Sequence, residues 1–193
     1  MTALILAGGQ SRRLKQDKAW LELGGKPLIR RVADCLAPLF DEILLVGAAS
    51  IRYKELGLTI IPDEQPGEGP LGGLYTGLQV AQTPWVFCCA CDMPFLNPTL
   101  ITALLDQIEP EYTAVVCRWE QHLHPLHAFY SQSSLPQIKQ TLDVDKRRLH
   151  DLLANLRVKY IDEGFIKLYD PQGLSFFNLN TPDALQKATE IFF

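Results

Sequence analysis

The stretch that decides the fold is Thr2-Ala3-Leu4-Ile5-Leu6-Ala7-Gly8-Gly9-Gln10-Ser11-Arg12-Arg13, at the start of the chain. Its apolar part, Thr2–Leu6, has the length and continuity of a strand that is buried on both faces of a sheet. The two glycines that follow let the backbone turn tightly, so that successive N–H groups can bind a phosphate. Arg13 and Lys18 add formal positive charge. A tight turn with a solvated basic surface is the alternative interpretation.

Strand and helix patterns alternate along the rest of the chain. Strand patterns occur at residues 42–46, 58–61, 85–91, 114–119, 126–130, 158–162 and 175–179, with a polar, histidine-containing link before 126–130. Helix patterns occur at residues 27–36, 71–81, 98–108, 135–142 and 146–156, and after Thr181-Pro182-Asp183. This alternation predicts an α/β fold, a mostly parallel sheet with helices on both faces, in which ligands bind at the carboxyl ends of the strands.

Composition and charge exclude several classes of protein. The 193 residues suit one domain, and a net charge of −4 gives no general attraction to nucleic acid or to anionic lipid. We find neither a signal peptide nor an apolar run approaching the roughly 20 residues of a membrane span. Five cysteines, an odd number, argue against a disulfide scaffold and favour a reducing, cytoplasmic location.

Asp92 follows the strand pattern at 85–91, at the edge of the sheet where a ligand is expected. A carboxylate there suits Mg²⁺, which typically binds one or two carboxylates and completes its shell with phosphates and water. The cysteines at 88, 89 and 91 are interpreted as core residues. His122, His124 and His127 would bind one metal only if a bulge turned them to the same side of their strand.

Residues 67–72, Gly-Glu-Gly-Pro-Leu-Gly, fit the pattern G-x-G-x-x-G of dinucleotide-binding proteins. We reject this interpretation because Pro66 and Pro70 remove N–H groups from a turn that would have to donate them. The motif also follows the third predicted strand instead of the first.

Several motifs together resemble the MobA-like nucleotidyltransferases, and within them the molybdenum cofactor guanylyltransferases. They are Leu6-Ala7-Gly8-Gly9, Ser11, Arg13, Asp17-Lys18, Leu23-Gly24-Gly25-Lys26-Pro27-Leu28, Asp63, Gly69-Pro70-Leu71-Gly72-Gly73-Leu74, Cys91-Asp92-Met93-Pro94, His124-Pro125-Leu126 and Asn178-Leu179-Asn180-Thr181-Pro182. The chain departs from the family pattern at Lys15, where a glycine is usual, and at 46–50, where an asparagine is missing.

The resemblance implies a three-layer, Rossmann-like fold of the nucleotide-diphospho-sugar transferase type. It implies catalytic roles for Arg13, Lys18 and Asp92, with Asp92 also the Mg²⁺ ligand. The nucleotide-binding residues that it implies are Leu6, Ala7, Gly8, Gly9, Lys18, Asp63, Gly69, Pro70 and Leu71. The acceptor-binding residues that it implies are His124, Arg147, Arg148, Asn178 and Asn180.

The implied reaction transfers GMP from GTP to the terminal phosphate of molybdopterin, with Mg²⁺ and release of pyrophosphate. Residues 1–193 would form one domain, with a nucleotide-binding half at 1–110 and an acceptor-binding half at 111–193. Transient contact with proteins that carry or insert the molybdenum cofactor is a further expectation. The alternatives are a CTP-using molybdopterin cytidylyltransferase, a sugar-1-phosphate nucleotidyltransferase of the same fold, and a nucleotide-binding adaptor without chemistry.

Overall fold

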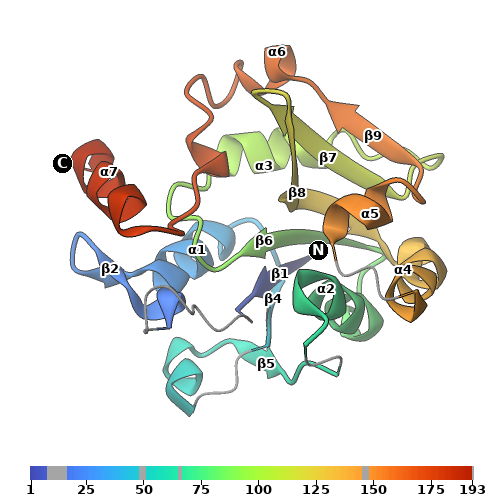
Figure 1. Cartoon of the computed structure of the whole chain (residues 1–193), viewed down its shortest axis with the longest axis horizontal. Helices are drawn as coiled ribbons and strands as arrows, with labels where there is room; N and C mark the ends of the chain where they lie inside the picture. The colour runs from blue at the N-terminus through green and yellow to red at the C-terminus, as the bar shows by residue number, and fades with distance from the viewer. Residues whose placement is uncertain (8–16, 48–50, 65–66, 145–147, 193) are drawn as a thin grey trace.

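The computed structural model of the chain describes residues 1–7, 17–47, 51–64, 67–144 and 148–192. Four of the predicted site residues, Gly8, Gly9, Arg13 and Arg147, lie outside these ranges. The described chain is built around a seven-stranded sheet with the order β5-β4-β1-β6-β8-β7-β9 (Figure 1). Its strands are β1 (Thr2–Leu6), β4 (Glu42–Val46), β5 (Thr59–Ile61), β6 (Trp85–Ala90), β7 (Ala114–Trp119), β8 (His122–Ser131) and β9 (Val158–Ile161).

The sheet is mostly parallel, as the alternation of strands and helices predicts. Strand β1 lies between β4 and β6 and runs parallel to both, and β5 is parallel to β4. Strand β8 pairs antiparallel with β6 and with β7, and β9 is parallel to β7. Among the seven described strands, β8 is therefore the one that runs against the others.

Helices cover both faces of the sheet because its central strands are apolar on both sides. In β1, Ala3 and Ile5 belong to one hydrophobic cluster, whereas Leu4 and Leu6 belong to the other. The first cluster contains residues of α1 (Leu28–Leu36) and α3 (Pro98–Leu105). The second contains residues of α2 (Gly69–Val80), α4 (Leu135–Asp143) and α5 (Leu149–Leu153). The result is a three-layer α/β/α arrangement.

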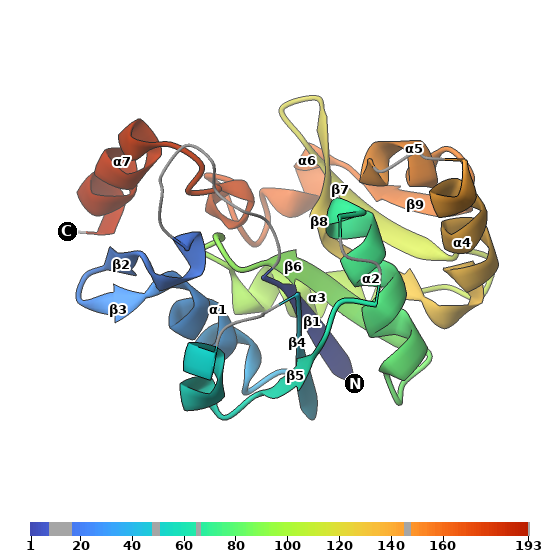
Figure 2. The same ribbon diagram turned by 60° about the horizontal axis from the view of Figure 1, so that its bottom comes forward.

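Smaller elements complete the fold. The two-stranded hairpin β2 (Glu22–Leu23) and β3 (Lys26–Pro27) lies beside the last helix, α7 (Pro182–Phe192) (Figure 1 and Figure 2). The remaining elements are the 3₁₀ turns η1 (Lys18–Trp20), η2 (Ile51–Leu56), η3 (Gln132–Ser134) and η4 (Leu174–Phe176), and helix α6 (Glu163–Ile166). None of the helices in the described ranges is long and apolar enough to cross a membrane.

Most predicted elements are confirmed, and β1, β4 and β7 have the predicted bounds. Two predictions are wrong. The link expected before 126–130 belongs to β8, which begins at His122 directly after Glu120 and Gln121, both in the left-handed region with φ of 49° and 64°. Residues 175–179 form no strand, because the chain there follows the short turn η4 and then an irregular path.

Close packing of α2 against β1 explains a glycine inside that helix. A Cβ atom at Gly77 would overlap the side chain of Leu4, which is fully buried. Gly164, in α6, has no atom within 4 Å of the same position. Close approach of α2 to β1 therefore accounts for a glycine at position 77.

We therefore expect Gly77→Ala to destabilise the fold by about 1–3 kcal/mol, since the buried side chain of Leu4 would have to shift within the packed core. Gly164→Ala is the matched control, for which helix propensity predicts no loss of stability and a gain of up to about 1 kcal/mol. Chemical denaturation of both variants measures the difference. Equal stabilities for the two variants would contradict the packing explanation.

Candidate active site

The ends of three neighbouring strands define the location of the candidate site. The amide of Ala7 donates to the carbonyl of Val46 at 2.9 Å, and the amide of Cys91 donates to the carbonyl of Leu6 at 3.1 Å. Pairing therefore continues one residue beyond the ends of β1 and β6. Ala7 and Asp92 consequently lie at the same edge of the sheet, the edge at which parallel sheets bind ligands.

Lys18, Asp92 and Asn180 come together at this edge. The ammonium of Lys18 lies 2.6 Å from Oδ1 of Asn180 and 4.0 Å from Oδ2 of Asp92. These residues come from η1, from the end of β6 and from the segment before α7. The structure thus joins two predicted catalytic residues to one predicted acceptor-binding residue.

The segment that carries Asn180 is fixed by backbone contacts. The amide of Leu179 donates to the carbonyl of Asp92 at 3.0 Å, so Asn178 and Asn180 lie on either side of that contact. Further back, the amide of Asn97 donates to Oγ of Ser175 at 3.0 Å, and the buried carboxylate of Asp170 accepts from the amide of Ser175 at 2.8 Å. This network takes the place of the strand that the sequence predicted at 175–179.

Burial dominates the electrostatics of Asp92. The side chain is 14% exposed, and desolvation raises the pKa of Asp92 even though Lys18 opposes the shift. The charge of Lys18 therefore does not fully compensate for the cost of burying the carboxylate. A carboxylate in this situation is suited to bind a cation, although no group of three or more His, Cys, Asp or Glu side chains in the described ranges forms a complete metal site.

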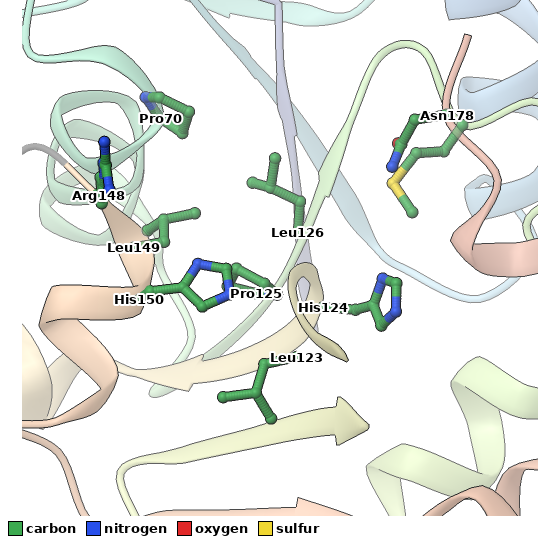
Figure 3. Close-up of a pocket in the computed structure, with 10 residues that line it drawn as sticks. Pro70, Leu123, His124, Pro125, Leu126, Arg148, Leu149, His150 and Asn178 are labelled. Atoms are coloured by element: carbon green, nitrogen blue, oxygen red, sulfur yellow. The ribbon is translucent and has the colours of Figure 1, made fainter. Parts of the chain in front are cut away.

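A pocket of about 340 Å³ is lined by residues from both halves of the chain, among them Met93, which directly follows Asp92. Figure 3 shows Arg148 and Pro70 on one side of it and Asn178 and His124 on the other. Its volume lies within the range of about 300–1,000 Å³ that is usual for small-molecule sites. The full lining is Pro70, Met93, Leu123, His124, Pro125, Leu126, Arg148, Leu149, His150 and Asn178.

An irregularity in β8 turns two histidines toward the same aromatic ring. Cys117 pairs with His124, whereas its neighbour Val116 pairs with Ala128, so the register shifts between them. The rings of His124 and His127 lie 4.3 Å and 5.2 Å from the ring of Phe176. In a regular strand the two side chains would point to opposite faces of the sheet. The bulge brings both of them to the same side.

The two histidines differ in burial. His127 is fully buried, and desolvation lowers the pKa of His127 to about 4. His124 lines the pocket, and burial lowers the pKa of His124 from its usual value of 6.5. The Nε2 atom of each ring is buried without a hydrogen-bond partner among the described residues. The lowered pKa keeps the His124 ring in the pocket lining neutral at pH 7.

The residues predicted to bind the nucleotide do not all have the same surroundings. Asp63 accepts a hydrogen bond of 3.5 Å from Thr76 of α2. The side chains of Leu6 and Leu71 belong to the hydrophobic core. Pro70, predicted on the nucleotide side, lines the pocket together with the acceptor-side residues His124, Arg148 and Asn178.

Sequence reasoning missed part of the pocket and one contact near Lys18. Met93, Leu123, Leu149 and His150 line the pocket without having been predicted there. Their proximity to Asp92, His124 and Arg148 in the sequence was an available signal, since each is within two residues of a predicted site residue. The hydrogen bond between Tyr53 and Asp17 had no such signal, because 36 positions separate the two residues.

Comparisons with known proteins give matches over most of the chain. Residues 3–160 match the model of the MobA-like NTP transferase domain. A probable molybdenum cofactor guanylyltransferase of Pelotomaculum thermopropionicum is 40% identical over 187 residues, covering 97% of this chain and 91% of that protein.

Two solved structures extend the likeness to the fold. The molybdopterin-guanine dinucleotide biosynthesis protein A of Archaeoglobus fulgidus has a TM-score of 0.87 and 27% identity, covering 100% of this chain and 98% of that chain. The 2-C-methyl-D-erythritol 4-phosphate cytidylyltransferase of Thermus thermophilus has a TM-score of 0.72 at 13% identity, covering 98% of this chain and 97% of that chain. The second likeness shows the fold alone, and it confirms the predicted fold of the nucleotide-diphospho-sugar transferase type.

The buried His127 predicts a measurable sensitivity to acid. Because its folded pKa of about 4 lies below the ordinary 6.5, the unfolded chain takes up a proton first as the pH falls. The stabilisation is thus complete above pH 6.5 and is lost as the pH falls toward 4, by about 2 kcal/mol at pH 5 relative to pH 8.

Denaturation of the wild type and of His127→Phe between pH 8 and pH 5 measures this contribution. The variant is expected to lose less stability over that range, because phenylalanine cannot take up a proton in the unfolded chain. Parallel curves for the two proteins would show that His127 titrates alike in the folded and unfolded states.

Proposed function

The chain belongs to the MobA-like NTP transferase domain family, and from this premise we propose that it is a molybdenum cofactor guanylyltransferase. The reaction transfers GMP from GTP to the terminal phosphate of molybdopterin and releases pyrophosphate. The observation that carries the proposal from the structure is the contact of Lys18 with Asp92 and Asn180 at the carboxyl edge of the sheet. The likeness to named guanylyltransferases over nearly the whole chain supports the choice of substrates.

The proposed chemistry needs little from a general base. An oxygen of the molybdopterin phosphate attacks the α-phosphorus of GTP, a new P–O–P bond forms, and the bond to the β-phosphate breaks. A phosphate monoester has a second pKa of about 6, so the nucleophile is mostly ionised at neutral pH. The protein then contributes position and charge, as in other phosphoryl-type transfers. Lys18 would stabilise the charge that develops on the α-phosphate and on the leaving pyrophosphate.

Mg²⁺ fits the donor that the chain offers. The carboxylate of Asp92 is a hard oxygen ligand whose burial Lys18 does not fully compensate, as the raised pKa of Asp92 indicates. Asp92 is therefore proposed to hold the ion, with the remaining ligands supplied by phosphate oxygens and water. When bound, Mg²⁺ would neutralise charge on the transferred phosphoryl group. Arg13, Gly8 and Gly9, outside the described residues, keep their predicted roles at the triphosphate.

The pocket lined by His124, Arg148 and Asn178 is the proposed acceptor site. Its apolar surface, given by residues such as Leu123 and Leu126, suits the ring system of an acceptor, and its polar groups suit the substituents. Most of the lining comes from the half at 111–193, which supports the proposed division into nucleotide-binding and acceptor-binding halves. Pro70 and Met93 are the members of the lining that come from the half at 1–110.

Nucleotide selectivity tests the proposal directly. With Mg²⁺ and molybdopterin present, GTP is expected to give pyrophosphate release, whereas CTP, ATP and UTP give little. Unfolding with each Mg²⁺–nucleotide complex provides an independent reading, since about 100-fold saturation adds roughly 2.7 kcal/mol. Selective reaction with CTP would replace the guanylyltransferase by the cytidylyltransferase, and chelation of Mg²⁺ is expected to stop the reaction.

Two variants separate the proposed roles of Lys18 and Arg148. Lys18→Ala is expected to lower kcat by about 10²–10³-fold with little change in the acceptor KM, because its charge acts on the transition state. Arg148→Ala is expected to raise the acceptor KM by about tenfold, as for the loss of one charge-assisted hydrogen bond. Arg118→Ala, at the exposed end of β7, serves as the matched control and should change neither constant. If Lys18→Ala only weakened binding of the acceptor, Lys18 would act on the acceptor and not on the phosphates of GTP.

A further inference from the structure

The turn that carries Lys18 is held by a second turn from another part of the chain. Tyr53 lies in η2, between β4 and β5, and only 2% of its surface is exposed. Its hydroxyl donates a hydrogen bond to Oδ2 of Asp17 at 2.6 Å. Asp17 is the residue that immediately precedes Lys18, so this contact fixes the backbone at the base of the Lys18 side chain.

The other carboxylate oxygen of Asp17 completes the cap of η1. Oδ1 of Asp17 accepts from the amide of Ala19 at 3.2 Å, which satisfies an N–H group at the start of the turn. One carboxylate thus accepts from its own turn on one side and from Tyr53 on the other. The second of these bonds links η1 to η2, the turn between β4 and β5.

Two contacts at the end of η1 also hold this turn against η2. The ring of Trp20 lies 5.4 Å from the ring of Tyr53, and the guanidinium of Arg52 lies 4.1 Å from the centre of the Trp20 ring. Lys18 is therefore bracketed by Asp17 and Trp20, both of which contact η2. Arg52 and Tyr53 of η2 thus contact the residues on either side of Lys18, which are Asp17 and Trp20.

We propose that Tyr53 is a positioning residue for the transfer reaction, which acts through Asp17 to hold Lys18 where it meets Asn180 and Asp92. The proposal rests on the proposed function of Lys18. Lysine is a flexible side chain, so its ammonium can stay within 2.6 Å of Asn180 and 4.0 Å of Asp92 only while its backbone is fixed. Small displacements of a charged group from the reacting atoms reduce rates strongly.

The chemistry of the phenol suits a permanent donor. Burial, followed by the hydrogen bond to Asp17, raises the pKa of Tyr53 well above its usual value of 10. The hydroxyl therefore keeps its proton and donates to Asp17 throughout the neutral range. Because the phenol has a single proton to donate and Asp17 accepts it, the influence of Tyr53 on the Lys18 ammonium is indirect.

Tyr53→Phe removes the hydroxyl and keeps the ring against Trp20. We expect kcat to fall by about tenfold, as for the loss of one hydrogen bond to a charged group, while the acceptor KM changes less than about twofold. Tyr160→Phe is the matched control, since Tyr160 lies on the edge strand β9, far along the sheet order from β4 and β5. The control should keep the wild-type kcat.

A double-mutant cycle separates positioning from a general effect on stability. Asp17→Ala should lower kcat at least as far as Tyr53→Phe, and adding Tyr53→Phe to Asp17→Ala should lower it no further. Asp17→Asn keeps an oxygen that can accept from Tyr53 or from Ala19, so it should retain more of kcat than Asp17→Ala. All rates are measured at least ~15 °C below the unfolding midpoint of each variant, so that only folded protein contributes.

Wild-type kcat in Tyr53→Phe, or additive losses in the cycle, would overturn the proposal. A variant whose midpoint falls while kcat stays unchanged would show a purely structural role, and this also overturns it. Failure of the proposed function is a different result, because the wild type itself would then not react with GTP and molybdopterin. In that case the same ratios of kcat are taken with the nucleotide and acceptor that do react.

Discussion

The candidate site depends above all on the register of β1 between β4 and β6. Leu6 is opposite Val46 on one side and Ala90 on the other, and the pairing continues through Ala7 and Cys91. Parallel strands that end together place the residues after them at one edge. A shift of one residue would exchange the two faces of β1 and would displace Ala7, at its end, relative to Cys91 and Asp92.

Hydrogen bonds outside the sheet bring the segment before α7 back to this edge. The carbonyl of Asp92 accepts from Leu179, and Leu179 is buried in a small cluster with Leu23, Leu28 and Ala188. The cluster attaches α7 and the β2–β3 hairpin to each other, and so places Asn180 opposite Lys18. Residues that are 162 positions apart therefore meet because of a local apolar cluster and one backbone hydrogen bond.

The sequence predicts the strands that are buried on both faces, since continuous apolar runs such as Thr2–Leu6 have few other possible environments. It fails at the β7–β8 hairpin, because Glu120 and Gln121 occupy left-handed positions where Asn-Gly would be the usual signal. Charge beside the first turn indicated Lys18, position after a buried strand indicated Asp92, and the family resemblance supplied Asn180. The structure brings the three together. No sequence pattern could identify Tyr53, whose role depends on a contact with a distant turn.

The way in which Lys18 is held bears on what the site can bind. Its ammonium is at hydrogen-bonding distance from the neutral amide oxygen of Asn180, whereas Asp92 is farther away, at 4.0 Å. A close ion pair would satisfy both charges and would leave little driving force for binding either an anion or a cation. Because a neutral partner holds the lysine instead, its positive charge stays available to a phosphate. The oxygens of Asp92 likewise stay available to a metal ion, and in the proposed reaction a triphosphate bound with Mg²⁺ would use both.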